Sequence, residues 1–204
     1  MGKCQKDIPK MELRLSEISY LLTIKNPDPS KIIKISFLEL LAERVLMLKK
    51  VGRQLEIIIN ETTSSNLTDL EKKLLIPLRN NKLDFQQYIA RIGRLSLRVM
   101  SWSREFDIDR LIKKHLISNG YLIQTDINIF GFKIPFYTRH TILTINTLKK
   151  YKSLDTIEMQ LKESIEEQYN RILDIDFDSF WQDLEADYNR ASLNFKPAIA
   201  YFNE

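Results

Sequence analysis

Apolar residues at helical spacing open the N-terminal half of the chain. Between residues 11 and 24 they recur every three or four positions, which predicts a first helix. Residues 26 to 30 read Asn-Pro-Asp-Pro-Ser and predict a turn, because each proline restricts its own backbone and that of the preceding residue.

The stretch from Ser36 to Val51 is apolar around most of a helical circumference. A helix that is apolar on all sides is normally buried, so this stretch predicts the central helix of an N-terminal core. We expect Gly52 to end this helix. The run from residue 55 to 59 is rich in isoleucine and predicts a strand.

Two capping patterns predict helices in the middle of the chain. Thr68 and Glu71 have the spacing of a capping box, and Asp84 and Gln87 repeat that spacing. Pro77 is expected to kink or end the first of these helices.

A row of arginines follows the second cap. Arg91, Arg94 and Arg98 are separated by steps of three and four, so their guanidinium groups are expected to share one helix face.

The clearest local order lies between residues 107 and 150. A short basic helix is predicted from Asp109 to Ser118, with apolar residues at helical spacing, and Gly120 suits its left-handed C-terminal position. Residues 121 to 139 are rich in β-branched and aromatic types around Gly131, which predicts a β-hairpin. Pro135 indicates an edge strand, because proline cannot donate to a strand ladder.

Helix, glycine, hairpin and a further segment is the order of a winged helix, in which the helix before the wing enters the major groove. The residues Gly120-Tyr121-Leu122-Ile123, Arg139 and Leu143-Thr144 also resemble the end of the winged-helix repressors related to multiple-antibiotic and phenolic-acid regulators. The resemblance covers about a fifth of the chain and implies a DNA-binding module. We expect the winged-helix-like part at about residues 84 to 152.

Two features depart from that family pattern. No glycine follows Leu143-Thr144, and the wing residues 128 to 136 are mostly apolar, with Lys133 as their one basic residue. We therefore assign no family from the sequence.

The C-terminal part predicts an acidic helical hairpin, residues 153 to 204. Apolar residues keep close to heptad spacing in a first helix, and a second helix is predicted from near Asp178. Asp174, Asp176, Asp178 and Glu185 also fit positions 1, 3, 5 and 12 of a calcium-loop frame. That frame requires glycine where Ser179 stands, so the pattern favours helix capping.

Composition places the chain among ordinary globular proteins. Of 204 residues, 44% are apolar and 28% charged, and only 5 are glycine, which favours a mainly helical fold. No apolar run approaches the roughly 20 residues that a membrane helix needs. The N-terminus shows no apolar signal core, which predicts a cytoplasmic protein in which residues 1 to 10 form a flexible tail.

Charge is distributed unevenly along the chain. Residues 153 to 204 hold 4 basic and 12 acidic side chains, a net charge of −8. The whole chain has 31 basic and 27 acidic side chains, so residues 1 to 152 hold 27 and 15, a net charge of +12. These residues include the predicted basic body, residues 11 to 152. Such an asymmetry predicts either attraction of a polyanion to the body or docking of the acidic helices on the body or on a second subunit.

No motif for catalysis or cofactor binding is present in the sequence. It lacks a phosphate-binding loop, a dinucleotide fingerprint and a nucleophile elbow, and neither histidine has a partner at metal-ligand spacing. We therefore expect no enzymatic activity, no cofactor and no metal site.

Two hypotheses of function follow. The first is a non-enzymatic winged-helix-like regulator that binds duplex nucleic acid through basic helix faces, since lysine and arginine neutralise phosphates. The second is a structural or adaptor subunit that binds protein partners, or forms a homodimer, through its acidic C-terminal helices and basic body. The candidate nucleic-acid contacts are Arg91, Arg94, Arg98, Arg110, Lys113, Lys114, Lys133 and Arg139.

Overall fold

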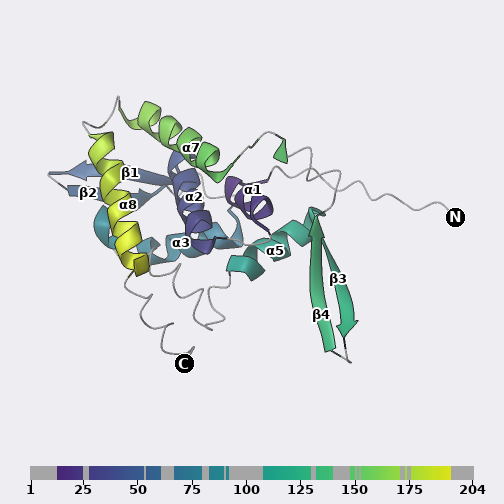
Figure 1. The fold of residues 1–204 in the computed structure, drawn as a ribbon. Coiled ribbons are helices and arrows are strands. Elements are labelled where there is room, and N and C mark those ends of the chain that lie inside the picture. Colours follow the sequence, from purple (N-terminus) through teal and green to yellow (C-terminus); the bar gives the residue numbers. More distant parts are fainter. Residues whose placement is uncertain are drawn as a thin grey trace.

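A computed structural model describes residues 13–24, 28–52, 54–60, 67–79, 83–89, 91, 108–129, 132–139, 148–149, 151, 153–170, 173 and 176–193. The tail expected at residues 1 to 10 lies outside this part. The described part of the chain is mainly helical, as its composition predicted, and contains two separate two-stranded antiparallel sheets (Figure 1). In chain order the elements are α1 (Leu15–Leu22), α2 (Pro29–Ala42), β1 (Leu46–Val51), β2 (Gln54–Ile59), α3 (Asp69–Arg79), α5 (Ile108–Ser118), β3 (Leu122–Ile129), β4 (Phe132–Arg139), α7 (Leu154–Tyr169) and α8 (Phe177–Leu193).

Helix α2 is the centre of the core. Asp28 caps it by accepting from the Lys31 amide at 3.2 Å, and Pro29 begins it at a position where no amide donor is needed. Helices α1, α3 and α7 pack around α2, so every described side chain from Ile32 to Leu41 is buried. The predicted burial of this apolar stretch is confirmed.

The predicted extent of that helix, Ser36 to Val51, is wrong. Helix α2 begins earlier and ends at Ala42, because Arg44 takes a left-handed backbone conformation with φ of +59°. Residues 46 to 51 form β1, which pairs with β2 through a turn at Gly52, where φ is +64°. The strand predicted at residues 55 to 59 is present as β2, but its partner β1 was not predicted.

Both predicted capping patterns in the middle of the chain are confirmed. The Thr68 amide donates to Glu71 Oε2 at 2.7 Å, and the Glu71 amide donates to Thr68 Oγ1 at 3.2 Å. The Gln87 amide donates to Asp84 Oδ1 at 2.7 Å. Helix α3 continues through Pro77 to Arg79.

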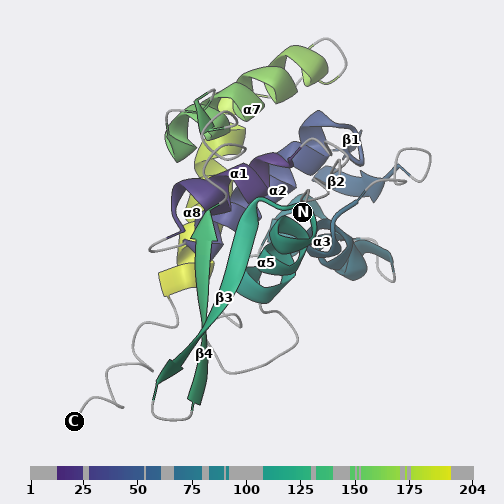
Figure 2. The ribbon, with the colours of Figure 1, turned by 90° about the vertical axis from the view of Figure 1, so that its right-hand side faces the viewer.

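The hairpin predicted between residues 121 and 139 is present as β3 and β4. Its register pairs Leu122 with Arg139 and Ile129 with Phe132. Because the sheet has two strands, Pro135 lies in an edge strand, as predicted. In both ribbon views the hairpin extends away from the helices, starting beside the end of α5 (Figures 1 and 2).

The acidic C-terminal helices pack on the N-terminal body. Helix α7 lies along α2, and its buried residues Ile157, Leu161 and Ile165 belong to the same apolar core as α2. Lys34 of α2 contacts Glu158 of α7 at 2.8 Å. Lys34 also pairs with Glu185 of α8, and Lys31 pairs with Asp155 of α7. Docking of acidic helices on basic residues of the body, predicted from the charge asymmetry, is therefore observed.

Two further expectations concern this C-terminal part and the chain as a whole. Asp176 caps α8 by accepting from the Ser179 amide at 3.3 Å, which agrees with the preference for helix capping over calcium binding. In the part of the chain that the structure describes, no helix has the length and apolar character needed to cross a bilayer.

Candidate nucleic-acid interface

Helix α5 presents an apolar face to the core and a basic face to solvent. Ile112 and Leu116 are buried, whereas Arg110 and Lys114 are exposed. This division follows from helical spacing, because residues four apart lie one above the other. Helical spacing predicts that Arg110, Lys113 and Lys114 point outward; Arg110 and Lys114 are exposed, whereas Lys113 is half-buried.

The C-terminal end of α5 fixes the direction in which the hairpin starts. Gly120 has a φ of +73°, its amide donates to the Ile117 carbonyl at 3.0 Å, and the Tyr121 amide donates to the Leu116 carbonyl at 2.8 Å. These two bonds form a Schellman motif, which glycine favours because it has no Cβ. Strand β3 therefore leaves the helix at a defined angle.

Lys113 differs from its neighbours on α5. Its Nζ lies 4.2 Å from the centre of the Tyr137 ring in β4, and its side chain is half-buried. A cation over an aromatic face is attracted to it by about 0.5–2 kcal/mol, depending on exposure. Lys113 thus joins the helix to the hairpin, and a phosphate contact by Lys113 remains a prediction.

His115 points toward α1 and not toward the basic face. Its Nδ1 contacts Glu17 Oε1, and Asn119 lies 3.1 Å from its Nε2. The residue connects α5 to α1.

The remaining predicted contacts are placed only in part. Arg91 is helical and exposed, while Arg94 and Arg98 lie outside the described residues, so their common face is not tested. In the hairpin, Arg139 pairs in register with Leu122 at the base, and Lys133 pairs with Asn128 near the tip. Lys133 and Arg139 are six positions apart in β4, a separation of about 20 Å at the usual rise of a strand; both side chains lie outside the described part.

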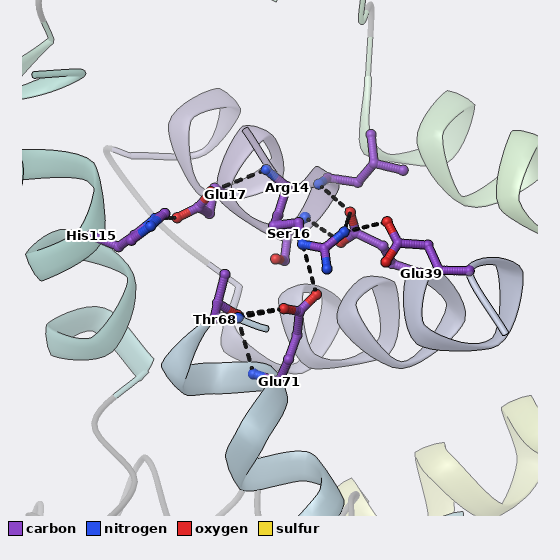
Figure 3. Close-up of polar contacts among 9 residues, drawn as sticks. Arg14, Ser16, Glu17, Glu39, Thr68, Glu71 and His115 are labelled. Carbon is purple, nitrogen blue, oxygen red and sulfur yellow. Dashed lines mark hydrogen bonds and ion pairs between the residues drawn. The ribbon is translucent and has the colours of Figure 1, made fainter. Parts of the chain in front are cut away.

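Sequence reasoning missed a buried polar cluster beneath α1, shown in Figure 3. We call it the Arg14 cluster; its members are Arg14, Glu17, Glu39, Glu43, Glu71 and His115. Arg14 and Glu17 lie at the start of α1, and Glu39 and Glu43 lie at the C-terminal end of α2. Glu71 lies at the start of α3 and His115 on α5, so the cluster joins four helices. Its sequence signal was a glutamate inside an otherwise apolar run, Glu39 between Leu38 and Leu40.

Glu39 is bound by the first amides of α1. The Leu15 amide donates to its Oε1 at 2.9 Å and the Ser16 amide to its Oε2 at 3.4 Å. Helix N-termini leave such amides without intrahelical partners, so Glu39 caps α1 from a neighbouring helix. Burial raises the pKa of Glu39 to about 8, and the charges of Glu71 and Glu43 act in the same direction.

Glu71 has a different set of donors. It accepts from the Thr68 amide and hydroxyl, at 2.7 and 2.9 Å, and its Oε1 lies 3.3 Å from Arg14 Nε. Burial nevertheless raises the pKa of Glu71. Because Glu39 and Glu71 are enclosed and accept from amides at helix N-termini, the cluster packs the four helices together.

Among the described residues, no group of His, Cys, Asp or Glu has the arrangement needed to hold a metal ion. No protein-family model matches the chain, and a comparison with curated proteins finds no significant match.

Proposed function

We propose that this protein is a non-enzymatic, winged-helix-like regulator that binds nucleic acid through α5 and the β3–β4 hairpin. The observation that supports the proposal is the placement of Arg110 and Lys114, both exposed, on a helix directly before a projecting hairpin. In a winged helix this outward face lies in the major groove. Arg91, at an exposed helical position earlier in the chain than α5, adds another cation. The net positive charge of residues 1 to 152 also favours approach to a polyanion.

The test uses the exposed members of the α5 face. The double variant Arg110→Ala with Lys114→Ala removes two cations, while Lys113 is kept because its removal would also break the contact with Tyr137. The matched control is Lys49→Ala with Lys72→Ala, which removes two exposed lysines from β1 and α3.

Binding of a labelled DNA duplex is measured by fluorescence anisotropy over a series of salt concentrations. Each lost phosphate contact lowers the slope of log K against log salt by about one, so the α5 variant should lose about two and the control none. Equal slopes for the parent and the α5 variant would remove α5 from the interface. A parent protein without salt-dependent binding would refute nucleic-acid binding altogether.

An adaptor that binds a protein partner is the second candidate, favoured by the composition of the hairpin. Alternate positions of β3 and β4 share one face of a two-stranded sheet. One face holds Ile123, Thr125 and Thr138, whose side chains are exposed, Ile123 at 46%. Residues 127 to 136 of the hairpin are mostly apolar in sequence. An apolar face suits a protein partner better than phosphates. The carboxylates of α7 and α8 that pair with Lys31 and Lys34 are already used within the chain.

The two candidates respond differently to one substitution. Ile123→Asp should leave the salt-dependent binding of a duplex through α5 nearly unchanged, but it should abolish binding of a protein partner to the apolar face. Co-purification of partners with the parent and with the variant, read by mass spectrometry, measures this difference.

A further inference from the structure

The Arg14 cluster contains more buried negative groups than buried positive ones. Its one guanidinium group, on Arg14, faces the carboxyl groups of Glu39 and Glu71, whose side chains are 6% and 0% exposed. Removing an ionised carboxylate from water without a counter-charge is costly, and such groups take up a proton instead. With one guanidinium group for two buried carboxyl groups, the geometry favours protonation of one of them near neutral pH.

The distances assign that proton to Glu39. Glu71 accepts two hydrogen bonds from Thr68, at 2.7 and 2.9 Å, and its Oε1 forms an ion pair with Arg14 Nε at 3.3 Å, which favours the anion. Glu39 accepts one amide at 2.9 Å and a weaker one at 3.4 Å, and its nearest guanidinium nitrogen is 3.9 Å away. Glu71 is thus the better match for the positive charge of Arg14.

The other charged groups around Glu39 reinforce this assignment. Glu43, at the end of α2, pairs with Arg14 and competes for its charge. Glu71 faces the site from α3, and both acidic groups disfavour ionisation of Glu39. From α1, Glu17 accepts from the Arg14 amide at 3.0 Å and is paired with His115 of α5.

We propose that the Arg14 cluster is a pH-sensitive clasp that holds α1 against α2 and α3 and loosens when Glu39 loses its proton. Ionisation would place a second, unbalanced negative charge next to Glu71 in a buried site. Because Glu17 links α1 to His115, loosening of α1 should also release α5. The clasp does not depend on nucleic-acid binding, and its readouts are proton binding, stability and amide exchange.

The sign of the effect follows from the shift of Glu39. Its pKa rises from 4.5 in the unfolded chain to about 8 in the folded protein, so the folded state holds the extra proton between these values. Stability from this group is complete below pH 4.5 and is lost as the pH rises through about 8. Between pH 6 and pH 8, unfolding releases about one proton, because Glu39 is protonated in the folded protein and ionised in the unfolded chain. Over these two pH units the loss of stability corresponds to a fall in Tm of about 5–10 °C for a chain of this length.

The first measurement follows the side-chain carboxyl carbons of the full-length parent by ¹³C NMR as a function of pH. One glutamate should titrate near pH 8, and its signal should be absent from Glu39→Gln, whose amide keeps an acceptor for the Leu15 N–H. Thermal unfolding at pH 6 and pH 8 should show a smaller fall in Tm for Glu39→Gln than for the parent. The control is Glu163→Gln, at an exposed position of α7, which should keep the fall seen in the parent.

Amide hydrogen exchange locates the change in the parent and does not require a folded variant. Protection factors, corrected for the intrinsic effect of pH, should fall between pH 6 and pH 8 for residues 15 to 22 and for α5 more than for α3. If every glutamate of the parent titrates below pH 6, the proposal is wrong. It is equally refuted by uniform loss of protection across α1, α3 and α5, or by a fall in Tm that Glu39→Gln leaves unchanged.

Discussion

Replacing Lys34 by methionine should show what holds the acidic helices on the body. The Lys34 Nζ contacts Glu158 of α7 at 2.8 Å and also pairs with Glu185 of α8, and the lysine is 8% exposed. Methionine keeps most of the apolar stem in place, so the substitution removes mainly the charge.

The expected cost comes from two carboxylates that lose a partner. Breaking a buried pair costs about 3–5 kcal/mol, because the remaining charge stays buried. Two observations reduce this figure here. Lys162 Nζ remains 3.1 Å from Glu158 and 3.6 Å from Glu185, and the Glu185 side chain is 38% exposed. We therefore expect Lys34→Met to lower the free energy of unfolding by about 1–3 kcal/mol at neutral pH.

The effect should depend on pH. Burial acts to raise the pKa of Glu158, but the hydrogen bonds and charges of Lys34 and Lys162 outweigh it and lower the pKa below its ordinary value of 4.5. The stability contributed by a carboxylate with a lowered pKa is present above 4.5 and is lost as the pH falls through the lowered value. The difference in the free energy of unfolding between the parent and Lys34→Met should therefore decrease as the pH falls.

Urea unfolding followed by circular dichroism measures both effects, at pH 7 and at a series of lower pH values. The matched control is Lys72→Met on α3, whose side chain is 57% exposed and whose Nζ lies 3.6 Å from Asp69. A surface pair of this kind contributes less than about 1 kcal/mol. If Lys34→Met costs no more than Lys72→Met at pH 7, the ion pairs of Lys34 do not hold α7 and α8 in place.

Two other substitutions test the core and the end of α2. Leu41→Ala removes a fully buried side chain and should cost about 2–5 kcal/mol, whereas an unchanged Tm would contradict its place in the core. Arg44→Gly should be more stable than Arg44→Ala by about 1 kcal/mol in thermal unfolding, because φ of +59° strains any residue that has a Cβ. Both variants lack the arginine side chain, so equal Tm values would show that the backbone at residue 44 is not strained.

The features that the sequence predicted well depend on residues close together in the chain. The capping box of Thr68 and Glu71, the cap at Asp84 and the glycine at the end of α5 each involve residues within a few positions of one another. The β3–β4 hairpin is similar, because a change from helical to alternating spacing marks its start. Such local signals need no knowledge of the remaining fold.

The run from Leu46 to Val51 could not be assigned by the same reasoning. A short apolar run fits a buried helix and a strand equally well, and its length here allowed continuation from α2. Pairing with β2 decided in favour of a strand, and the left-handed backbone at Arg44 separated it from the helix. Both depend on where neighbouring segments lie.

The charged contacts of the interior were decided by tertiary structure alone. In sequence, Glu39 and Lys34 are two charged residues in an apolar helix, and nothing nearby gives their partners. The partners of Glu39 lie at the start of α1, and those of Lys34 lie on α7 and α8, up to 151 residues away. The aromatic neighbour of Lys113 was also decided by tertiary structure, because Tyr137 reaches it only when β4 lies beside α5. A buried charge is tolerated only where folding brings a counter-charge or a donor to it, and the order of residues does not show which segments will meet.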